Sequence, residues 1–413
     1  MGAFSTPLSG LTSAQEQLQA VSNNLANIDT DGYKTQNLTF SDIFLQTGVT
    51  NGSGDPLQIG SGVAVSSTDS DYTEGNLAAT GTSSNMAISG NGFFITQSVN
   101  GAQDYTRAGD FTTNHAGQLV TPSGDLVLGY PAVSGVVNTS AALQPLQVGS
   151  MTSPAVASTM IGITANLDSD AAIGATAPSS SLSIYDSLGS AHILSVSYTK
   201  TAAGTWSYTV TVPSADVVAG TTGDTTVGTG TLIFNGSGQL DPSSTLGPIS
   251  IPTLADGATV PLALAGPFGT ATNPTITQTA MASATSATTT DGFASGTLTS
   301  FTVQPDGTIN GTFTSGNTLA LGQVAVASFA NNQGLTSVGS NNYQSTAASG
   351  AAVIGLAGTG GRGTVVGGSV EQSNVDIASE FAKLIVAQQA YSANAKSITT
   401  FNTLSQATLA MIQ

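Results

Sequence analysis

Apolar side chains near the N-terminus follow the spacing of a helix that packs lengthwise on another helix. From residue 11 to residue 28 they recur in alternating steps of three and four residues. Such heptad-like spacing places them on one face of an α-helix. Pro7 favours a helical first turn, and Asp31 with Gly32 favours a stop. The residues of this predicted N-terminal seam are Leu11, Ala14, Leu18, Val21, Leu25 and Ile28.

The C-terminal end repeats the pattern over a longer stretch. No glycine or proline interrupts residues 369–413, so the sequence predicts one helix of about 38 residues, roughly 57 Å long at 1.5 Å per residue. Ser373 is its expected cap, with the Asp376 carboxylate reaching back in a capping-box-like start. The residues of this predicted C-terminal seam are Ile377, Phe381, Leu384, Gln388, Tyr391, Ala395, Ile398, Asn402, Ser405, Leu409 and Ile412.

The chain between the two helices has the composition and pattern of β-structure. Glycine supplies 49 of 413 residues and charged side chains only 7%, against averages near 7% and about 25%. Short apolar runs alternate with Gly, Asn, Asp and Pro turns. Residues 85–88 and 93–96, for example, flank a Gly-Asn-Gly turn that predicts a hairpin. The Ala/Thr/Ser-rich residues 279–290 are expected to be an exposed linker.

The predicted fold class is multidomain and mainly β, with N- and C-terminal α-helices forming a coiled-coil-like terminal domain around nested β-domains. Composition shifts and turn clusters set the boundaries. Residues 35–74 are expected to be an irregular connector with one short strand. The expected domains are a terminal helical domain (1–34 and 370–413), the connector (35–74), a first β-domain (75–147 and 283–369) and an inserted outer β-domain (148–282).

Charge and cysteine content exclude several classes of protein. The formal net charge is −17, and the 6 basic residues are scattered, which argues against nucleic-acid partners and anionic membrane surfaces. The absence of cysteine excludes disulfides, thiolate metal sites and cysteine nucleophiles. No basic region precedes an apolar run near the N-terminus, and no run approaches 18 apolar residues. We therefore expect neither a cleaved signal peptide nor membrane insertion.

No sequence motif predicts a catalytic, cofactor-binding or metal-binding site. Residues 358–363 match G-x-G-x-x-G, but a strand-like stretch follows where a dinucleotide site needs a helix, so a flexible linker is expected. His115 and His192 are the only histidines, and they lie in different predicted domains without zinc-binding spacing. Paired catalytic carboxylates that converge only in the folded chain leave no motif in the sequence, so a site of that kind stays open.

The two seams have a simple interpretation, in which the terminal helices pair within one molecule. The C-terminal helix is, however, about twice as long as its partner, which leaves part of it uncovered. It also carries apolar residues outside its seam, and an apolar surface of that breadth favours burial between subunits. Contacts of this kind build helical filaments when the rotation does not close. These additional residues are Val375, Ile385, Val386, Phe401, Leu404 and Met411.

Several segments together resemble the bacterial flagellar rod and hook proteins. Residues 8–11 and 22–34 are similar to the N-terminal signature of that family, and residues 371–376 and 387–396 to its C-terminal signature. Residues 88–94 and 105–111 resemble the shared β-domain. Residues 165–169 and 184–192 resemble an additional domain that favours the hook branch over the shorter distal-rod branch. The sequence departs from the family at Gln389, where a basic residue is usual, and residues 401–413 carry no charge.

The resemblance implies a structural subunit without catalytic activity or cofactor. It implies self-polymerisation through the two seams into the flexible joint between flagellar rod and filament. Implied partners are the chain itself, the distal rod protein, the hook cap protein, the hook-filament junction protein and the flagellar type III export apparatus. The implied location is the extracellular part of the flagellum, reached without a cleaved signal peptide. The alternatives are a distal-rod subunit and a β-rich secreted adhesin or polysaccharide-active enzyme.

Overall fold

The computed structural model describes residues 5–50, 56–149, 151–217, 222–270 and 273–411. The predicted seam residue Ile412 lies outside this description. The chain divides into two compact units. Unit 1 comprises Met1–Gly149, Phe301–Gly311 and Leu319–Gln413, and unit 2 comprises Ser150–Ser300 and Thr312–Thr318. Within the described residues, no helix is both long and apolar enough to cross a membrane.

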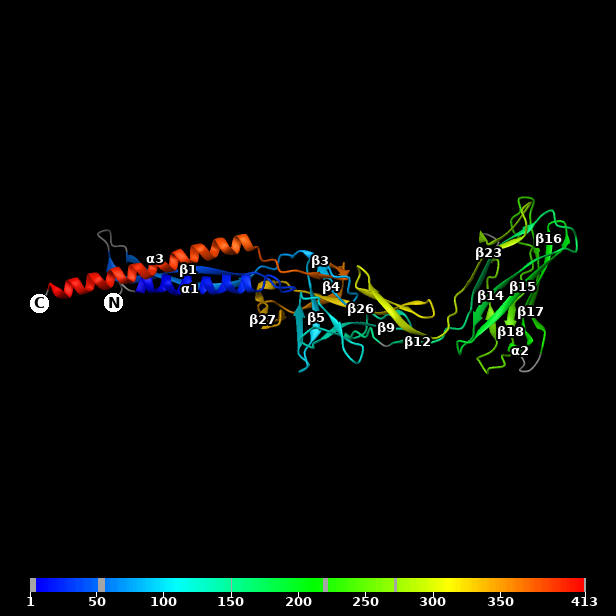
Figure 1. Ribbon diagram of the computed structural model, residues 1–413, viewed down its shortest axis with the longest axis horizontal. Helices are drawn as coiled ribbons and strands as arrows, with labels where there is room; N and C mark the ends of the chain where they lie inside the picture. The colour runs from blue at the N-terminus through cyan, green and yellow to red at the C-terminus, as the bar shows by residue number, and fades with distance from the viewer. Residues whose placement is uncertain (1–4, 51–55, 150, 218–221, 271–272, 412–413) are drawn as a thin grey trace. The chain divides into compact units, whose positions relative to one another are not determined.

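Unit 1 contains both predicted terminal helices. Helix α1 (Ser5–Ala26) and helix α3 (Ile377–Ala410) lie side by side (Figure 1). Asp376 caps α3, because its side chain accepts hydrogen bonds from the backbone N–H groups of Ala378 and Ser379. The expectation that Ser373 is the cap was wrong, because the Asp376 carboxylate satisfies the free N–H groups of the first turn directly. The helix therefore begins at Ile377, and it has 34 residues instead of the predicted 38 or so.

The segment expected to be an irregular connector is a long antiparallel hairpin. Strand β1 (Gln36–Thr50) pairs with β2 (Pro56–Ser70), and the ladder contains bulges at Ser66 and Ser61 of β2, opposite the steps after Thr39 and Ile43 of β1. Each bulge shifts the two-residue alternation of β2 by one position, which hides the pattern of this strand in the sequence. The hairpin is attached to α1, because Val63 N–H donates to Ser9 Oγ at 3.2 Å. The described residues of this segment, 35–50 and 56–74, therefore belong to unit 1 and pair as strands over most of their length.

The β-domain of unit 1 departs from the predicted hairpin around Gly90 and Gly92. Strand β4 (Met86–Ser89) pairs with β30 (Thr364–Gly367), whereas β5 (Phe93–Gln97) pairs with β6 (Gln103–Thr106). Both glycines have positive φ angles, of 102° and 133°, so they carry the chain from one sheet to another. The core on the second sheet consists of Phe93, Ile95, Tyr105, Leu128, Ala325, Ala327 and Tyr343.

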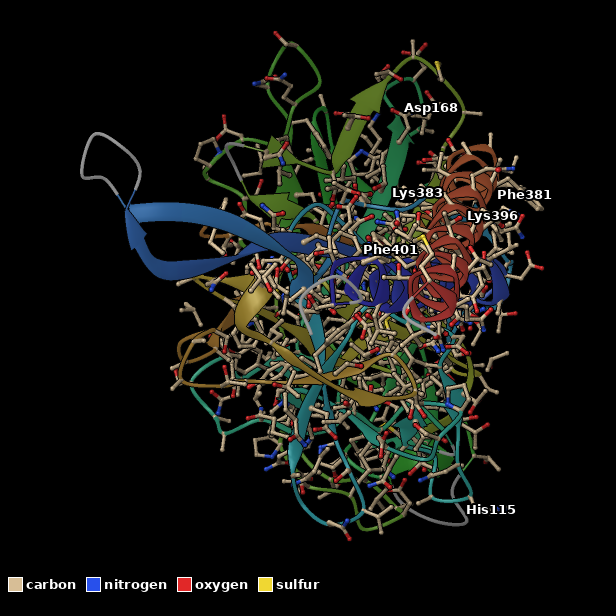
Figure 2. The ribbon with its side chains drawn as sticks, turned by 90° about the vertical axis from the view of Figure 1, so that its left-hand side faces the viewer. His115, Asp168, Phe381, Lys383, Lys396 and Phe401 are labelled. Carbon is tan, nitrogen blue, oxygen red and sulfur yellow. The ribbon has the colours of Figure 1, made fainter. Side chains whose placement is uncertain are left out.

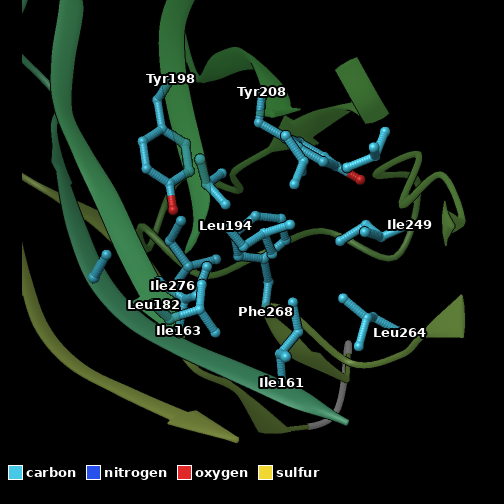
Figure 3. Close-up of a cluster of buried hydrophobic side chains, with 14 of the residues drawn as sticks. Ile161, Ile163, Leu182, Leu194, Tyr198, Tyr208, Ile249, Leu264, Phe268 and Ile276 are labelled. Atoms are coloured by element: carbon cyan, nitrogen blue, oxygen red, sulfur yellow. The ribbon is translucent and has the colours of Figure 1, made fainter. Parts of the chain in front are cut away.

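Unit 2 has a complete hydrophobic core of its own. Four strands pair in sequence order: β14 (Thr176–Tyr185), β15 (Ala191–Ala202), β16 (Thr205–Pro213) and β17 (Asp224–Ile233). Burial alternates along β16, and Trp206, Tyr208 and Val210 are each at most 1% exposed. All three belong to one buried cluster, and Figure 3 shows Tyr208 in this cluster with Phe268 and aliphatic side chains of neighbouring segments.

A three-stranded sheet completes unit 2 and corrects the predicted linker. Strand β13 (Ile161–Asp168) lies between β22 (Ile276–Thr279) and β23 (Ala284–Thr290). The Ala/Thr/Ser run expected as an exposed linker therefore contains the edge strand β23. Its side chains are mostly exposed, so the strand lacks the apolar alternation that would identify it from sequence.

The remaining elements are short, or cross the boundary between the units. Those of unit 1 are β3 (Leu77–Ala79), β7 (Thr112–Thr113), β8 (Leu119–Val120), β9 (Leu126–Val133), β10 (Val136–Val137), β11 (Gln144–Pro145), the 3-10 helix η1 (Asn332–Gly334), β27 (Thr336–Gly339), β28 (Asn342–Gln344), β29 (Val353–Leu356) and β31 (Ser369–Glu371). Those of unit 2 are β12 (Thr152–Ser153), α2 (Ser214–Val217), β18 (Ile249–Ile251), β19 (Leu262–Leu264), β20 (Gly269–Thr270) and β21 (Asn273–Pro274). The boundaries fall within β24 (Gly296–Val303), β25 (Thr308–Phe313) and β26 (Thr318–Ser328).

Candidate self-assembly site

Helix α3 contacts α1 through a row of small and polar side chains. Glu380 and Ala387 are buried at this contact, and Asn394 lies one heptad further along. A Cβ atom added to Gly10 would lie 2.8 Å from Asn394 Nδ2, so glycine allows the close approach of the two helices. Gly10 faces Asn394 and Asn24 contacts Glu380, so the helices run antiparallel. The pairing within the chain therefore uses a row at positions 380, 387 and 394, next to the predicted C-terminal seam.

The predicted C-terminal seam remains largely uncovered in the single chain. Leu384 and Ile398 are half-buried. The large apolar members of the seam that are exposed, by 41 to 64%, are Ile377, Phe381, Tyr391 and Leu409. The seam is thus an accessible apolar face of α3.

The N-terminal seam is covered to a greater extent. Val21 and Ala14 are buried against the rest of unit 1, at 3% and 5% exposure. Ile28 follows the end of α1, because the helix ends at Ala26. The half-buried members of the seam are Leu11, Leu18, Leu25 and Ile28.

The last part of α3 carries several exposed large apolar side chains. Every residue from 401 to 410 is exposed. Because Gly10 faces Asn394 in an antiparallel pair, α3 continues past the described start of α1 (Figure 1). Figure 2 shows Phe381, Lys396 and Phe401 along this helix. The exposed fractions are 38% for Phe401, 61% for Leu404, 64% for Leu409 and 81% for Met411.

A buried polar network fixes the register of α1 on α3. Asn24, which is 1% exposed, donates from Nδ2 to Glu380 Oε2 at 3.0 Å. Its Oδ1 accepts hydrogen bonds from Gln36 N–H at 2.9 Å and from Tyr33 Oη at 3.0 Å. Burial, and then the Glu380 carboxylate, raise the pKa of Tyr33. A one-residue slip of either helix would leave these buried groups unpaired, so the network selects one register.

A second buried network attaches the terminal segments to the β-domain of unit 1. The Glu371 carboxylate is fully buried and binds the Lys34 ammonium and, at 3.1 Å, Arg107 Nη1. Gly75 N–H donates to Glu371 Oε1 at 2.9 Å. Burial lowers the pKa of Lys34, and the attraction of Glu371 opposes this shift only in part. One carboxylate thus joins segments near residues 34, 75 and 107 to the start of the C-terminal segment.

Sequence reasoning missed this ion-pair network although a signal was present. Only 7% of the residues are charged, yet Lys34, Arg107 and Glu371 all occur within the motifs that carry the family resemblance. In such a chain, a charge inside each of three separate motifs indicates that the charges meet in the fold, because a buried charge requires a partner.

Residues 358–363 form an ordered turn and carry no dinucleotide-binding geometry. They connect β29 to β30, so a strand follows the glycines and the expected absence of a strand-to-helix turn is confirmed. Within this turn, Arg362 Nε donates to Leu356 O at 3.0 Å.

Four family models match the chain in sequence order. The model described as "Flagella basal body rod protein" matches residues 4–34, and the "Flagellar hook protein FlgE/F/G D1 domain" matches residues 87–167. The "Flagellar basal body protein FlaE D2 domain" matches residues 156–293, and the "Flagellar basal body rod FlgEFG protein C-terminal" model matches residues 366–411. The segments that resemble the family at both ends, and those that resemble its additional domain, thus lie within separate family models.

Curated relatives match over nearly the whole chain. The flagellar hook protein FlgE of Salmonella typhimurium is 34% identical over 411 residues, which cover 96% of this chain and 97% of that protein. FlgE of Escherichia coli is 33% identical over 414 residues, with 96% and 97% covered. FlgE of Treponema pallidum is 31% identical over 464 residues, with 100% and 99% covered.

A solved structure shares the fold. The crystal structure of the Helicobacter pylori flagellar hook protein FlgE2 covers 71% of this chain and 100% of its own, with a TM-score of 0.53 at 15% identity. Full-length relatives above 30% identity, together with the match to the additional domain, favour the hook branch over the distal-rod branch. The chain therefore belongs to the family of bacterial flagellar hook proteins, the structural subunits of the hook.

Proposed function

We propose that this chain polymerises by covering the exposed apolar face of α3 with copies of itself. The observation that carries the proposal is the exposure of every residue from 401 to 410, among them Phe401, Leu404 and Leu409. An exposed apolar stripe of this extent is typical of a binding surface. A surface that binds a different surface on an identical subunit extends into a helical array.

The residues proposed to carry self-assembly are those of the two seams. Val21 is already buried and supports α1 from within the chain, whereas the exposed C-terminal members contact neighbouring subunits. The proposed set is Leu11, Leu18, Val21, Leu25, Ile28, Ile377, Phe381, Leu384, Tyr391, Ile398, Leu409 and Ile412.

We propose a separate role for each of the domains expected from the sequence. Residues 1–34 and 370–413 form the polymerisation domain around a central channel, with the β1–β2 hairpin attached to α1. The first β-domain is the one expected at residues 75–147 and 283–369, except that β23 (Ala284–Thr290) pairs within unit 2. The inserted domain (148–282) and the first β-domain supply outer surfaces that slide past those of neighbours. Their low charge and small side chains favour weak contacts that can be exchanged as the hook bends.

The proposed setting is the extracellular flagellum. The chain would leave the cell through the flagellar type III export apparatus without a cleaved signal peptide and act without catalysis. Its proposed partners, besides itself, are the distal rod protein, the hook cap protein and the hook-filament junction protein. The family assignment supports these partners.

A double substitution in the tail of α3 tests the proposal. Each buried leucine contributes about 1.5–3 kcal/mol, so Leu404→Asp with Leu409→Asp should raise the critical concentration for assembly at least about a hundredfold. Both side chains are more than 60% exposed in the single chain, so thermal unfolding of the monomer should not change. Electron microscopy and sedimentation velocity measure the polymer.

The matched control places the same charges on an apolar surface of the β-domain of unit 1. Val133 and Val136 are 67% and 71% exposed, and their substitution by Asp should leave assembly intact. Equal loss of polymer in both double variants would show that added negative charge alone blocks assembly. Normal tubes from the Leu404 and Leu409 variant would overturn the proposal.

A further inference from the structure

We propose that His192, Asp186 and Asp256 of unit 2 form a binding site for a divalent transition-metal ion, with Asp216 orienting the imidazole. Asp186 follows β14, His192 lies in β15, Asp216 lies in α2, and Asp256 lies between β18 and β19. One ligand atom from each of Asp186, His192 and Asp256 lies within 4.8 Å of the other two. The site joins segments that are up to 70 positions apart in the sequence.

The distances between the ligand atoms suit a small divalent ion. His192 Nε2 lies 3.1 Å from Asp186 Oδ2 and 3.8 Å from Asp256 Oδ2. An ion about 2.0–2.2 Å from each ligand would hold them roughly 3.0–3.5 Å apart. Asp186 is already in place. Asp256, whose side chain is 29% exposed on a loop, would move in by a few tenths of an ångström.

The opposite atom of each carboxylate ligand is held by the backbone. Asp186 Oδ1 accepts hydrogen bonds from Leu188 N–H at 2.8 Å and Ser190 N–H at 2.9 Å. Asp256 Oδ1 accepts one from Ala258 N–H at 3.1 Å. Both carboxylates are therefore oriented so that Oδ2 points towards His192 Nε2.

The other nitrogen of the imidazole supplies an independent observation. His192 Nδ1 is buried and has no hydrogen bond of good geometry, although Asp216 Oδ2 lies 3.2 Å away. Histidines that bind metals usually donate their second ring N–H to a carboxylate, which fixes the tautomer and the ring. Coordination of the metal at Nε2 would place the ring proton on Nδ1, which could then donate a hydrogen bond to Asp216 Oδ2. The same tautomer would thus provide a ligand for the metal and a hydrogen-bond partner for the buried Nδ1.

The charges around the imidazole also favour a divalent cation. Three carboxylates surround one histidine, and Asp186 is completely buried. None of the described lysine or arginine side chains forms an ion pair with these carboxylates. A buried excess of negative charge is costly, and a divalent ion offsets it. Imidazole with carboxylates is a ligand set for first-row transition metals such as Zn²⁺.

The histidine content of the chain makes the test specific. His115 and His192 are the only two histidines, so nuclear magnetic resonance of the full-length protein resolves two imidazoles. Titration with Zn²⁺ should shift the His192 ring signals in a saturable way and leave those of His115 unchanged. Bound Zn²⁺ should also raise the unfolding temperature of unit 2, followed by the fluorescence of Trp206, the single tryptophan.

Variants separate ligation from folding. Asp256→Asn should abolish saturable Zn²⁺ binding, and Asp216→Asn should weaken it about 10–100-fold. The control Asp170→Asn removes an exposed carboxylate of unit 2 and should bind Zn²⁺ normally. Trp206 fluorescence verifies that each variant is folded.

Two outcomes would overturn the proposal. The first is the absence of a saturable shift at His192 up to millimolar Zn²⁺ in the unsubstituted protein. The second is unchanged Zn²⁺ affinity in both the Asp256→Asn and the Asp216→Asn variants. Polymer formation has no part in this measurement, so its result is independent of the proposed function.

Discussion

Unit 2 and the terminal helices solve the problem of apolar surface in opposite ways. In unit 2, Trp206, Phe268 and their neighbours are covered by strands of the same unit. In α3, the buried row consists of Glu380 and Ala387, whereas Phe381, Leu404 and Leu409 stay exposed. A unit that buries its core is complete as a monomer, whereas a helix that pairs through small and polar residues keeps its apolar face for other subunits. Substitutions in the core of unit 2 should therefore affect the stability of the monomer, whereas substitutions on the apolar face of α3 should affect binding between subunits.

The largest expected effect lies in unit 2. Trp206→Ala should destabilise that unit by about 3–5 kcal/mol, because a large side chain leaves a cavity in a closed core. Scanning calorimetry of the full chain should show the loss. By contrast, Leu404→Ala, at a 61% exposed position of α3, should change monomer stability by less than about 0.5 kcal/mol. A similar loss of stability in both variants would show that the exposed face of α3 contributes to monomer stability as much as the core of unit 2 does.

The buried ion-pair network of unit 1 should give an effect of nearly the same size. Glu371→Ala leaves Lys34 and Arg107 buried without their partner and should cost about 3–5 kcal/mol. Urea unfolding with a probe in unit 1 measures it. Glu371→Gln keeps the shape of the side chain and an acceptor for Gly75 N–H. The loss of stability in Glu371→Gln therefore measures the removal of the charge, and the additional loss in Glu371→Ala measures the removal of the side chain.

Alkaline pH should reveal the closed core of unit 2 through Tyr198. Burial raises the pKa of Tyr198 to about 12 from its ordinary value of 10, although a hydrogen bond with Ser180 acts in the opposite direction. Since the unfolded chain loses the proton first, stability is fully present below pH 10 and falls as the pH rises towards 12. At about 1.4 kcal/mol per pH unit, the loss is about 3 kcal/mol.

Chemical denaturation of unit 2 between pH 9 and 12 measures this slope. In Tyr198→Phe the contribution of this residue should disappear, so the curve should be shallower. An equally steep curve in that variant would assign the alkaline loss to other groups of the chain.

The smallest expected effect concerns the start of α3. Asp376→Ala removes the acceptor for two backbone N–H groups and should cost about 1 kcal/mol. Faster amide exchange at Ala378 and Ser379 would report it. Asp376→Ser retains a capping oxygen and should recover most of the protection, whereas unchanged exchange in Asp376→Ala would show that the packing of α3 alone holds its first turn.

The sequence predicted the features that depend on local pattern. Periodic apolar residues located both terminal helices, and short apolar runs located most of the inner strands. The sequence did not predict the β1–β2 hairpin, because bulges in β2 interrupt its alternation of apolar and polar residues. It did not predict β23 either, because the small residues of that strand are mostly exposed and show no apolar alternation. The turn around Gly90 was placed correctly, but its strands pair elsewhere, since pairing depends on distant segments.

By itself, the sequence determined where helices form and that their apolar faces exceed what one partner can cover. Only the tertiary structure decided which face of α3 contacts α1. The close approach at Gly10 and the Asn24–Glu380 hydrogen bond place a row of small and polar residues at this contact. Hydrophobic periodicity does not predict such a row, because its residues are not apolar. The tertiary structure also decided that Lys34, Arg107 and Glu371 meet, and that His192 lies among three aspartates. Buried charges converge from segments far apart in the chain, so the sequence can place a charge inside a motif but does not show which charges form contacts.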